Sequence, residues 1–128
     1  MKSPDARDVA VEFNNAISSR DLSKLGELMT EDHILITGTG DPVNGKEACL
    51  RAWNQFFELL PDYRNIFEKT WSVGQVVQMR GHSVSTDERM NGPAIWKAVV
   101  DGMRIQEWYV DEDTPAGRRR LGHDSGEG

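Results

Sequence analysis

Apolar residues in the first sixty positions recur three and four residues apart, the spacing of a helix with one buried face. Ser3 can cap a first helix, with Pro4 at its first position. The apolar face of this helix is Val9, Phe13, Ala16 and Ile17. Asp21 can cap a second, shorter helix, whose inward residues are Leu22, Leu25, Leu28 and Met29. A third helix is predicted over 46–60, where Pro61 ends it.

The short segment 33–37 and most of the chain after residue 62 have the β-branched, alternating composition of strands. The predicted strands are 33–37, 63–72, 75–86, 93–100 and 103–111. Glycine and proline make 38–45 a loop or a tight hairpin. Asp101-Gly102 predicts a hairpin turn between the last two strands. Helices followed by strands favour an α+β fold over an alternating α/β fold.

The chain has 128 residues, which fits one domain, predicted as 1–122, with 123–128 as a disordered tail. Its one cysteine, Cys49, excludes an internal disulfide and is expected to be a small buried hydrophobe. A net charge of −6 argues against a nucleic-acid partner, because phosphates repel an acidic surface. Apolar runs are too short to span a membrane, and no signal peptide is evident. We therefore expect a cytoplasmic protein.

Several segments carry a family resemblance through their order and spacing. They are Arg20-Asp21-Leu22, Glu31-Asp32-His33, 42–48, Trp53 with Phe56-Phe57, 60–64, 101–108 and 113–122. Together they resemble the SnoaL-like branch of the nuclear-transport-factor-two-like superfamily, over about residues 5–122. The resemblance implies a curved antiparallel sheet wrapped around three N-terminal helices into a cone with an apolar pocket. It also implies a homodimer formed through the sheet.

The resemblance implies a small-molecule site inside the cone, but it leaves the activity open among cyclisation, isomerisation, dehydration, epoxide hydrolysis and ligand binding alone. In the family, the strand at this position lines the pocket, so the resemblance implies that Arg80 and His82 point inward. There they would act on a carbonyl compound. His82 could move a proton, and Arg80 could hold an enolate oxygen. Asp111 would join them as an acid–base group if a β-bulge turned it inward.

The expected ligand contacts are Thr37, Trp53, Trp96, Gln106 and Trp108, with the tryptophans as flat apolar walls. Each candidate also has a purely structural interpretation. His82 could be an ordinary strand histidine, Arg80 could pair with Glu107 or Asp111, and the tryptophans could be core.

Epoxide hydrolysis is disfavoured, because the positions that would carry its machinery hold Leu35, Thr37 and Val110. Asp32-His33 lacks a third metal ligand at usable spacing, and no metal or cofactor is expected. The run 118–120 favours a solvated helix face or a dimer contact over a nucleic-acid patch. The leading hypothesis is cofactor-free acid–base chemistry, cyclase- or isomerase-like, on an apolar carbonyl compound. The alternative is a non-catalytic ligand-binding or dimerisation domain of the same fold.

Overall fold

A computed structural model of the protein describes residues 5–123. Its first helix, α1 (Ala6–Ser18), is capped by Asp5, whose carboxylate accepts from the Arg7 backbone N–H at 2.8 Å. Ser3 and Pro4, predicted to start this helix, lie outside the described residues. Asp21 caps α2 (Leu22–Glu27) as predicted. None of the helices in the described range is long and apolar enough to cross a membrane.

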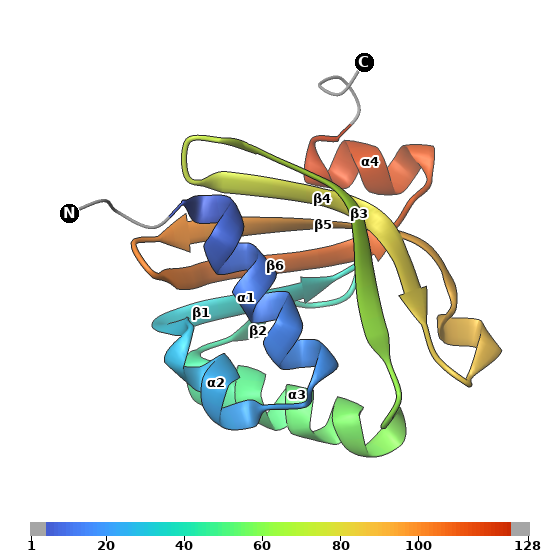
Figure 1. The fold of residues 1–128 in the computed structure, drawn as a ribbon, viewed down its shortest axis with the longest axis horizontal. Coiled ribbons are helices and arrows are strands. Elements are labelled where there is room, and N and C mark those ends of the chain that lie inside the picture. The colour runs from blue at the N-terminus through green and yellow to red at the C-terminus, as the bar shows by residue number, and fades with distance from the viewer. Residues whose placement is uncertain (1–4, 124–128) are drawn as a thin grey trace.

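The strands of residues 5–123 form one six-stranded sheet in the order β2-β1-β6-β5-β4-β3 (Figure 1). The strands are β1 (Met29–Thr37), β2 (Val43–Asn44), β3 (Arg64–Val73), β4 (Val76–Val84), β5 (Gly92–Asp101) and β6 (Arg104–Glu112). Neighbours are antiparallel except β1 and β6, which run parallel. The fold is therefore the predicted α+β class, with the hairpin at Asp101-Gly102 in its predicted place.

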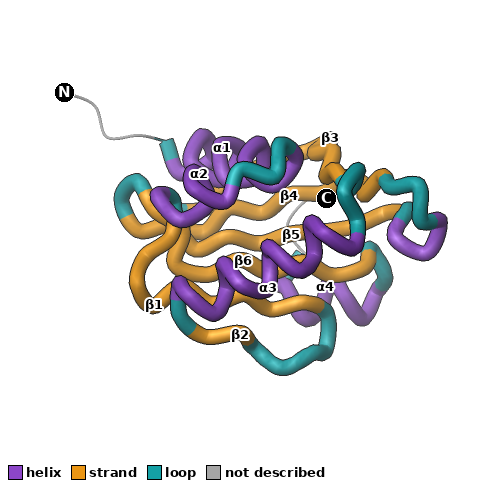
Figure 2. The backbone as a smooth tube through the Cα atoms, turned by 90° about the horizontal axis from the view of Figure 1, so that it is seen from below, coloured by secondary structure: helices purple, strands orange, loops and turns teal. Residues whose placement is uncertain are grey.

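Three helices close the inner face of the sheet. The helix α1 packs across β3, β4, β5 and β6, while α3 (Lys46–Leu59) packs beside β1 and β2 (Figure 2). The largest fully buried side chains on this face include Phe13, Trp96 and Trp108. Met29, expected in the second helix, instead begins β1 and is buried in the core. The core thus sits between the curved sheet and these helices.

The pleat of β4 is fixed by what its two faces pack against. Val77 and Met79 are fully buried in the core, so alternation sends Gly81 and Ser83 to the same inner face. Opposite Gly81, a register shift in β3 brings the neighbouring backbone very close. A Cβ on Gly81 would lie 1.9 Å from the Ile66 carbonyl oxygen, so only glycine fits there.

A fourth helix, α4 (Pro115–Leu121), lies on the outer face of the sheet against β5 and β6. Ion pairs hold it: Arg120 binds both carboxylate oxygens of Asp111 at 2.7 and 2.9 Å, and Arg118 binds Asp113. Gly117 lets the helix approach, because a Cβ there would lie 2.1 Å from the Glu112 carbonyl oxygen. Two of the three arginines in the basic run are therefore engaged within the fold.

His123 follows α4 and is fully buried, which contradicts its assignment to a disordered tail. Its Nε2 lies 3.1 Å from the Trp96 carbonyl oxygen, and its ring meets that of Trp71 edge-on. Burial lowers the pKa of His123. The rest of the predicted tail, 124–128, lies outside the described residues.

We predict that Arg120→Gln lowers the free energy of unfolding by about 1–3 kcal/mol, because it leaves the buried Asp111 carboxylate without its charged donor. Arg120 depresses the pKa of Asp111, so this contribution is complete above about pH 4 and is lost as pH falls through the lowered value. Chemical denaturation at several pH values measures it. The matched control is Arg119→Gln, one residue away and exposed, which should change little. Equal effects of the two substitutions would contradict the role given to Arg120.

Candidate functional site

An apolar cavity of about 410 Å³ lies between α3 and the inner face of the sheet. That volume is within the range of small-molecule sites. Its lining comprises Leu35, Thr37, Val43, Ala52, Trp53, Phe56, Tyr63, Asn65, Met90, Trp96, Trp108 and Val110. Four of the five expected ligand contacts, Thr37, Trp53, Trp96 and Trp108, are among these residues.

Gln106, the fifth expected contact, does not line the cavity. The register of β5 and β6 shifts at this point, from Val99 opposite Glu107 to Val100 opposite Ile105. Ile105 and Trp108 are both fully buried although they are three residues apart, so strict alternation fails between them. Strict alternation from Trp108 predicts an inward Gln106, and this irregularity makes that prediction wrong.

Aromatic contacts set the shape of the cavity wall. On α3, the Trp53 ring meets Phe56 edge-on at 5.7 Å, and Phe56 meets Tyr63 edge-on at 4.7 Å. Across the cavity, Trp108 packs on Phe13 from α1, with ring centroids 4.6 Å apart. These contacts favour fixed ring positions, so the wall is largely preformed.

A buried hydrogen-bond chain includes two of the polar side chains at this wall, Tyr63 and Asn65. The Tyr63 hydroxyl lies 2.9 Å from Ser83 Oγ, and Ser83 Oγ donates to Asn65 Oδ1 at 3.3 Å. From α1, Asn14 Nδ2 donates to the Asn65 carbonyl oxygen and ties β3 in place. None of these residues was among the predicted site residues. Ser83 could have been predicted, because it shares a face of β4 with the apolar residues Val77 and Met79.

Arg80 and His82 lie on the outer face of the sheet, so the prediction that they line the pocket is wrong. They alternate with Val77 and Met79, whose burial in the core leaves the outer face to them. His82 Nδ1 lies 3.1 Å from Glu68 Oε2, and the Arg80 guanidinium lies over the Trp71 ring at 5.6 Å. Neither group reaches a ligand held in the cavity.

Asp111 also faces outward, as alternation from Trp108 indicates, and no bulge turns it toward the cavity. Its side chain is 2% exposed and is held by Arg120 beneath α4. The Arg120 guanidinium holds the pKa of Asp111 below its usual range. The expected catalytic role of Asp111 therefore has no geometric support.

None of the three histidines of the chain lines the cavity. His33 is fully buried, with Nδ1 2.7 Å from the Ile105 carbonyl oxygen, and burial lowers its pKa. Cys49 is also fully buried, and burial raises the pKa of its thiol. Within residues 5–123, no three histidine, cysteine or carboxylate side chains gather as metal ligands.

The family follows from comparison with known proteins. The model of the SnoaL-like domain matches residues 10–114, which is most of the chain. The protein belongs to the SnoaL-like family. This match confirms the resemblance drawn from the sequence. No curated protein sequence matches the chain significantly.

Solved structures place this SnoaL-like protein among nuclear-transport-factor-two-like and cystatin-like folds. A cystatin-fold protein from Novosphingobium aromaticivorans is 20% identical, with a TM-score of 0.73 over 84% of this chain and 97% of that one. A candidate SnoaL-like polyketide cyclase from Shewanella putrefaciens is 16% identical, with a TM-score of 0.76 over 94% and 86%. An LEH-like epoxide hydrolase from M. tuberculosis is 14% identical, with a TM-score of 0.74 over 91% and 88%. At these identities the likeness establishes the fold alone.

In this SnoaL-like protein, the connection between β4 and β5 borders the cavity. Met90, in the short 3-10 helix η1 (Glu88–Met90), lines it. Tyr63, Met90 and Val110 also line an adjoining hollow of about 340 Å³, so the cavity continues toward this connection.

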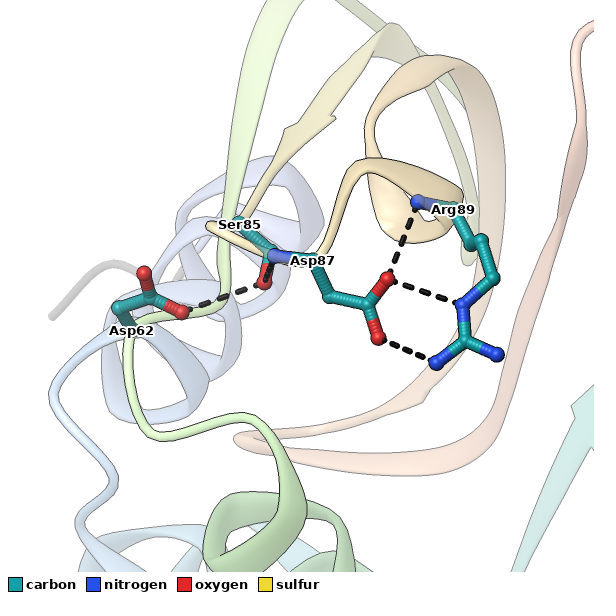
Figure 3. A network of polar contacts seen from close by, with 4 residues as sticks. All are labelled: Asp62, Ser85, Asp87 and Arg89. Atoms are coloured by element: carbon teal, nitrogen blue, oxygen red, sulfur yellow. Dashed lines mark hydrogen bonds and ion pairs between the residues drawn. The ribbon is translucent and has the colours of Figure 1, made fainter.

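The connection is tied to the turn before β3 through Asp62. Its carboxylate accepts from Ser85 Oγ at 3.2 Å (Figure 3). It also accepts from the Thr86 backbone N–H at 3.0 Å. Ser85 Oγ in turn accepts from the Asp87 N–H, and Asp87 binds Arg89 through both carboxylate oxygens (Figure 3). Hydrogen bonds from Thr86 and Ser85 lower the pKa of Asp62. This network holds Met90 at the edge of the cavity.

We predict that Asp62→Ala makes the Thr86 amide exchange with solvent several-fold faster, because it removes the acceptor of that N–H. Amide hydrogen exchange followed by NMR measures this residue by residue. Glu58→Ala, which removes an exposed carboxylate at the end of α3, should leave the Thr86 amide unchanged. Unaltered exchange in the Asp62 variant would show that another group holds the segment.

Proposed function

We propose that the protein binds a flat, apolar small molecule in the cavity between α3 and the sheet, without acid–base catalysis. The observation that carries this proposal is the cavity lining, in which Tyr63 is the one ionisable side chain among the described residues. The aromatic walls of Trp53, Trp96 and Trp108 suit a ring system, and Thr37 adds a hydroxyl.

Proton abstraction at neutral pH needs a base whose pKa lies near the working pH. Burial raises the pKa of the Tyr63 hydroxyl above its ordinary value near 10, so the group stays protonated at neutral pH. His82, the base expected from the sequence, lies on the opposite face of the sheet. Binding therefore has better support than proton transfer.

The positions at which the resemblance expects hydrolytic machinery do reach the cavity, but they carry the wrong chemistry. Leu35, Thr37 and Val110 all line it, and none has a carboxylate or an amide. The described lining has no carboxylate or histidine to act as a base toward water, which argues against epoxide hydrolysis despite the epoxide hydrolase among the structural neighbours.

A second candidate is cofactor-free cyclisation or isomerisation, favoured by the candidate polyketide cyclases among the structural neighbours. In that case Tyr63 would act as the proton donor to the carbonyl oxygen of the substrate, since it is the ionisable group at the wall. Tyr63→Phe would then abolish turnover while leaving substrate affinity within a few fold.

The homodimer through the sheet stays a prediction. The helix α4 covers the outer face at β5 and β6, so a second copy would pack over β3 and β4. A cytoplasmic location likewise stays a prediction.

The four tryptophans provide a direct binding assay. Trp53, Trp96 and Trp108 line the cavity and their indole N–H groups donate to no described acceptor, whereas Trp71 is on the outer face with Arg80. In ¹⁵N-labelled protein, we expect naphthalene to shift the three cavity indole signals saturably and to leave the Trp71 signal in place. Trp71→Phe assigns the reference signal.

Ala52→Leu, which places a larger side chain inside the cavity, should weaken naphthalene binding. Asn54→Leu, on the exposed side of α3, should leave naphthalene binding unchanged. A shift confined to Trp71, or no saturable shift at all, would reject the cavity as the binding site.

A further inference from the structure

We infer that Ser83 sets the ligand preference of the cavity by fixing the direction of the Tyr63–Ser83–Asn65 chain, so that the site selects a flat apolar compound bearing a hydroxyl group. This inference rests on the proposed function. The three residues come from the segment before β3, from β4 and from β3, and each is less than a tenth exposed. Two of them, Tyr63 and Asn65, line the cavity.

The direction of the chain follows from proton counting. Asn65 Oδ1 has no proton, so its 3.3 Å contact with Ser83 Oγ uses the single hydroxyl proton of Ser83. The contact of 2.9 Å between Ser83 Oγ and the Tyr63 hydroxyl then needs the Tyr63 proton. Tyr63 donates to Ser83, and Ser83 donates to Asn65. The Tyr63 oxygen is left to accept a hydrogen bond at the cavity wall.

The other end of the chain offers a donor. Asn65 Oδ1 is taken by Ser83, and Asn65 Nδ2 donates to no described acceptor. The wall therefore presents an acceptor at Tyr63 and an amide N–H donor at Asn65. A hydroxyl group satisfies both, because its proton can go to Tyr63 and its oxygen can accept from Asn65.

A ligand with a carbonyl alone matches only half of this arrangement. To donate to a carbonyl, Tyr63 would withdraw its proton from Ser83. Either the bond between Tyr63 and Ser83 is then lost, or Ser83 turns its proton toward Tyr63 and leaves Asn65 Oδ1 without a donor. Both outcomes give up one buried hydrogen bond, which is costly. The same cost opposes Tyr63 as a general acid, so the chain supports binding over the cyclase alternative.

Three matched probes test this: 2-naphthol, which can donate and accept, 2-acetylnaphthalene, which can only accept, and naphthalene, which can do neither. Affinities are measured by the indole NMR titration and expressed relative to naphthalene for the same protein. For the wild type we expect 2-naphthol to bind about three- to tenfold more tightly than 2-acetylnaphthalene, the effect of one net hydrogen bond.

Ser83→Ala frees the Tyr63 proton, so 2-acetylnaphthalene should gain about three- to tenfold relative to naphthalene while 2-naphthol keeps its affinity. Tyr63→Phe should instead remove the advantage of 2-naphthol with no gain for 2-acetylnaphthalene. General damage to the fold would not raise the affinity for 2-acetylnaphthalene in Ser83→Ala and leave it unraised in Tyr63→Phe.

The results separate the inference from the proposed function. Saturable naphthalene binding with equal wild-type affinities for 2-naphthol and 2-acetylnaphthalene overturns the inference and leaves the binding function standing. Absence of naphthalene binding at the cavity indoles rejects both. If Ser83→Ala does not fold, the wild-type ratio and the Tyr63→Phe ratio still decide the matter.

Discussion

Packing of Val77 and Met79 against the core fixes the pleat of β4, and the chemistry of both faces of the sheet follows from it. Side chains alternate along a strand, so a shift of one residue would exchange the two faces completely. The close approach of β3 at Gly81 makes such a shift still less favourable, because no other residue fits under the Ile66 carbonyl. Ser83 is therefore inside and His82 outside.

The two faces of the sheet consequently have different electrostatic characters. The inner face holds an apolar cavity whose polar wall is a neutral chain of a phenol, a hydroxyl and an amide. The outer face holds charges, and Asp111, which is buried there, is paired with Arg120 of α4. Burial of an unpaired charge is costly, so this segregation is what a stable fold of this sequence requires. It also leaves the cavity suited to a neutral ligand.

The helices, the main strands and the hairpin at Asp101-Gly102 could be predicted from the sequence, because these elements depend on local spacing and turn chemistry. The aromatic wall was also predictable, since Trp53 lies on the apolar face of a helix. Even α4 had local signals, with Thr114 as a cap, Pro115 at its start and Gly122 at its end. The prediction that Arg80 points inward was wrong because it followed a family motif. The alternation of buried and exposed side chains along β4 places Arg80 on the outer face.

Other features could not be read from the sequence. The bulge that displaces Gln106 depends on pairing with β5, and the contacts of Asp62 with residues more than twenty positions away exist only in the folded chain. The most direct test of the account is a crystal structure of the protein with 2-naphthol bound. The account predicts the ligand between Trp53, Trp96 and Trp108, with its hydroxyl at Tyr63. A ligand seated on the outer face against Arg80 and His82, with the cavity empty, would contradict it.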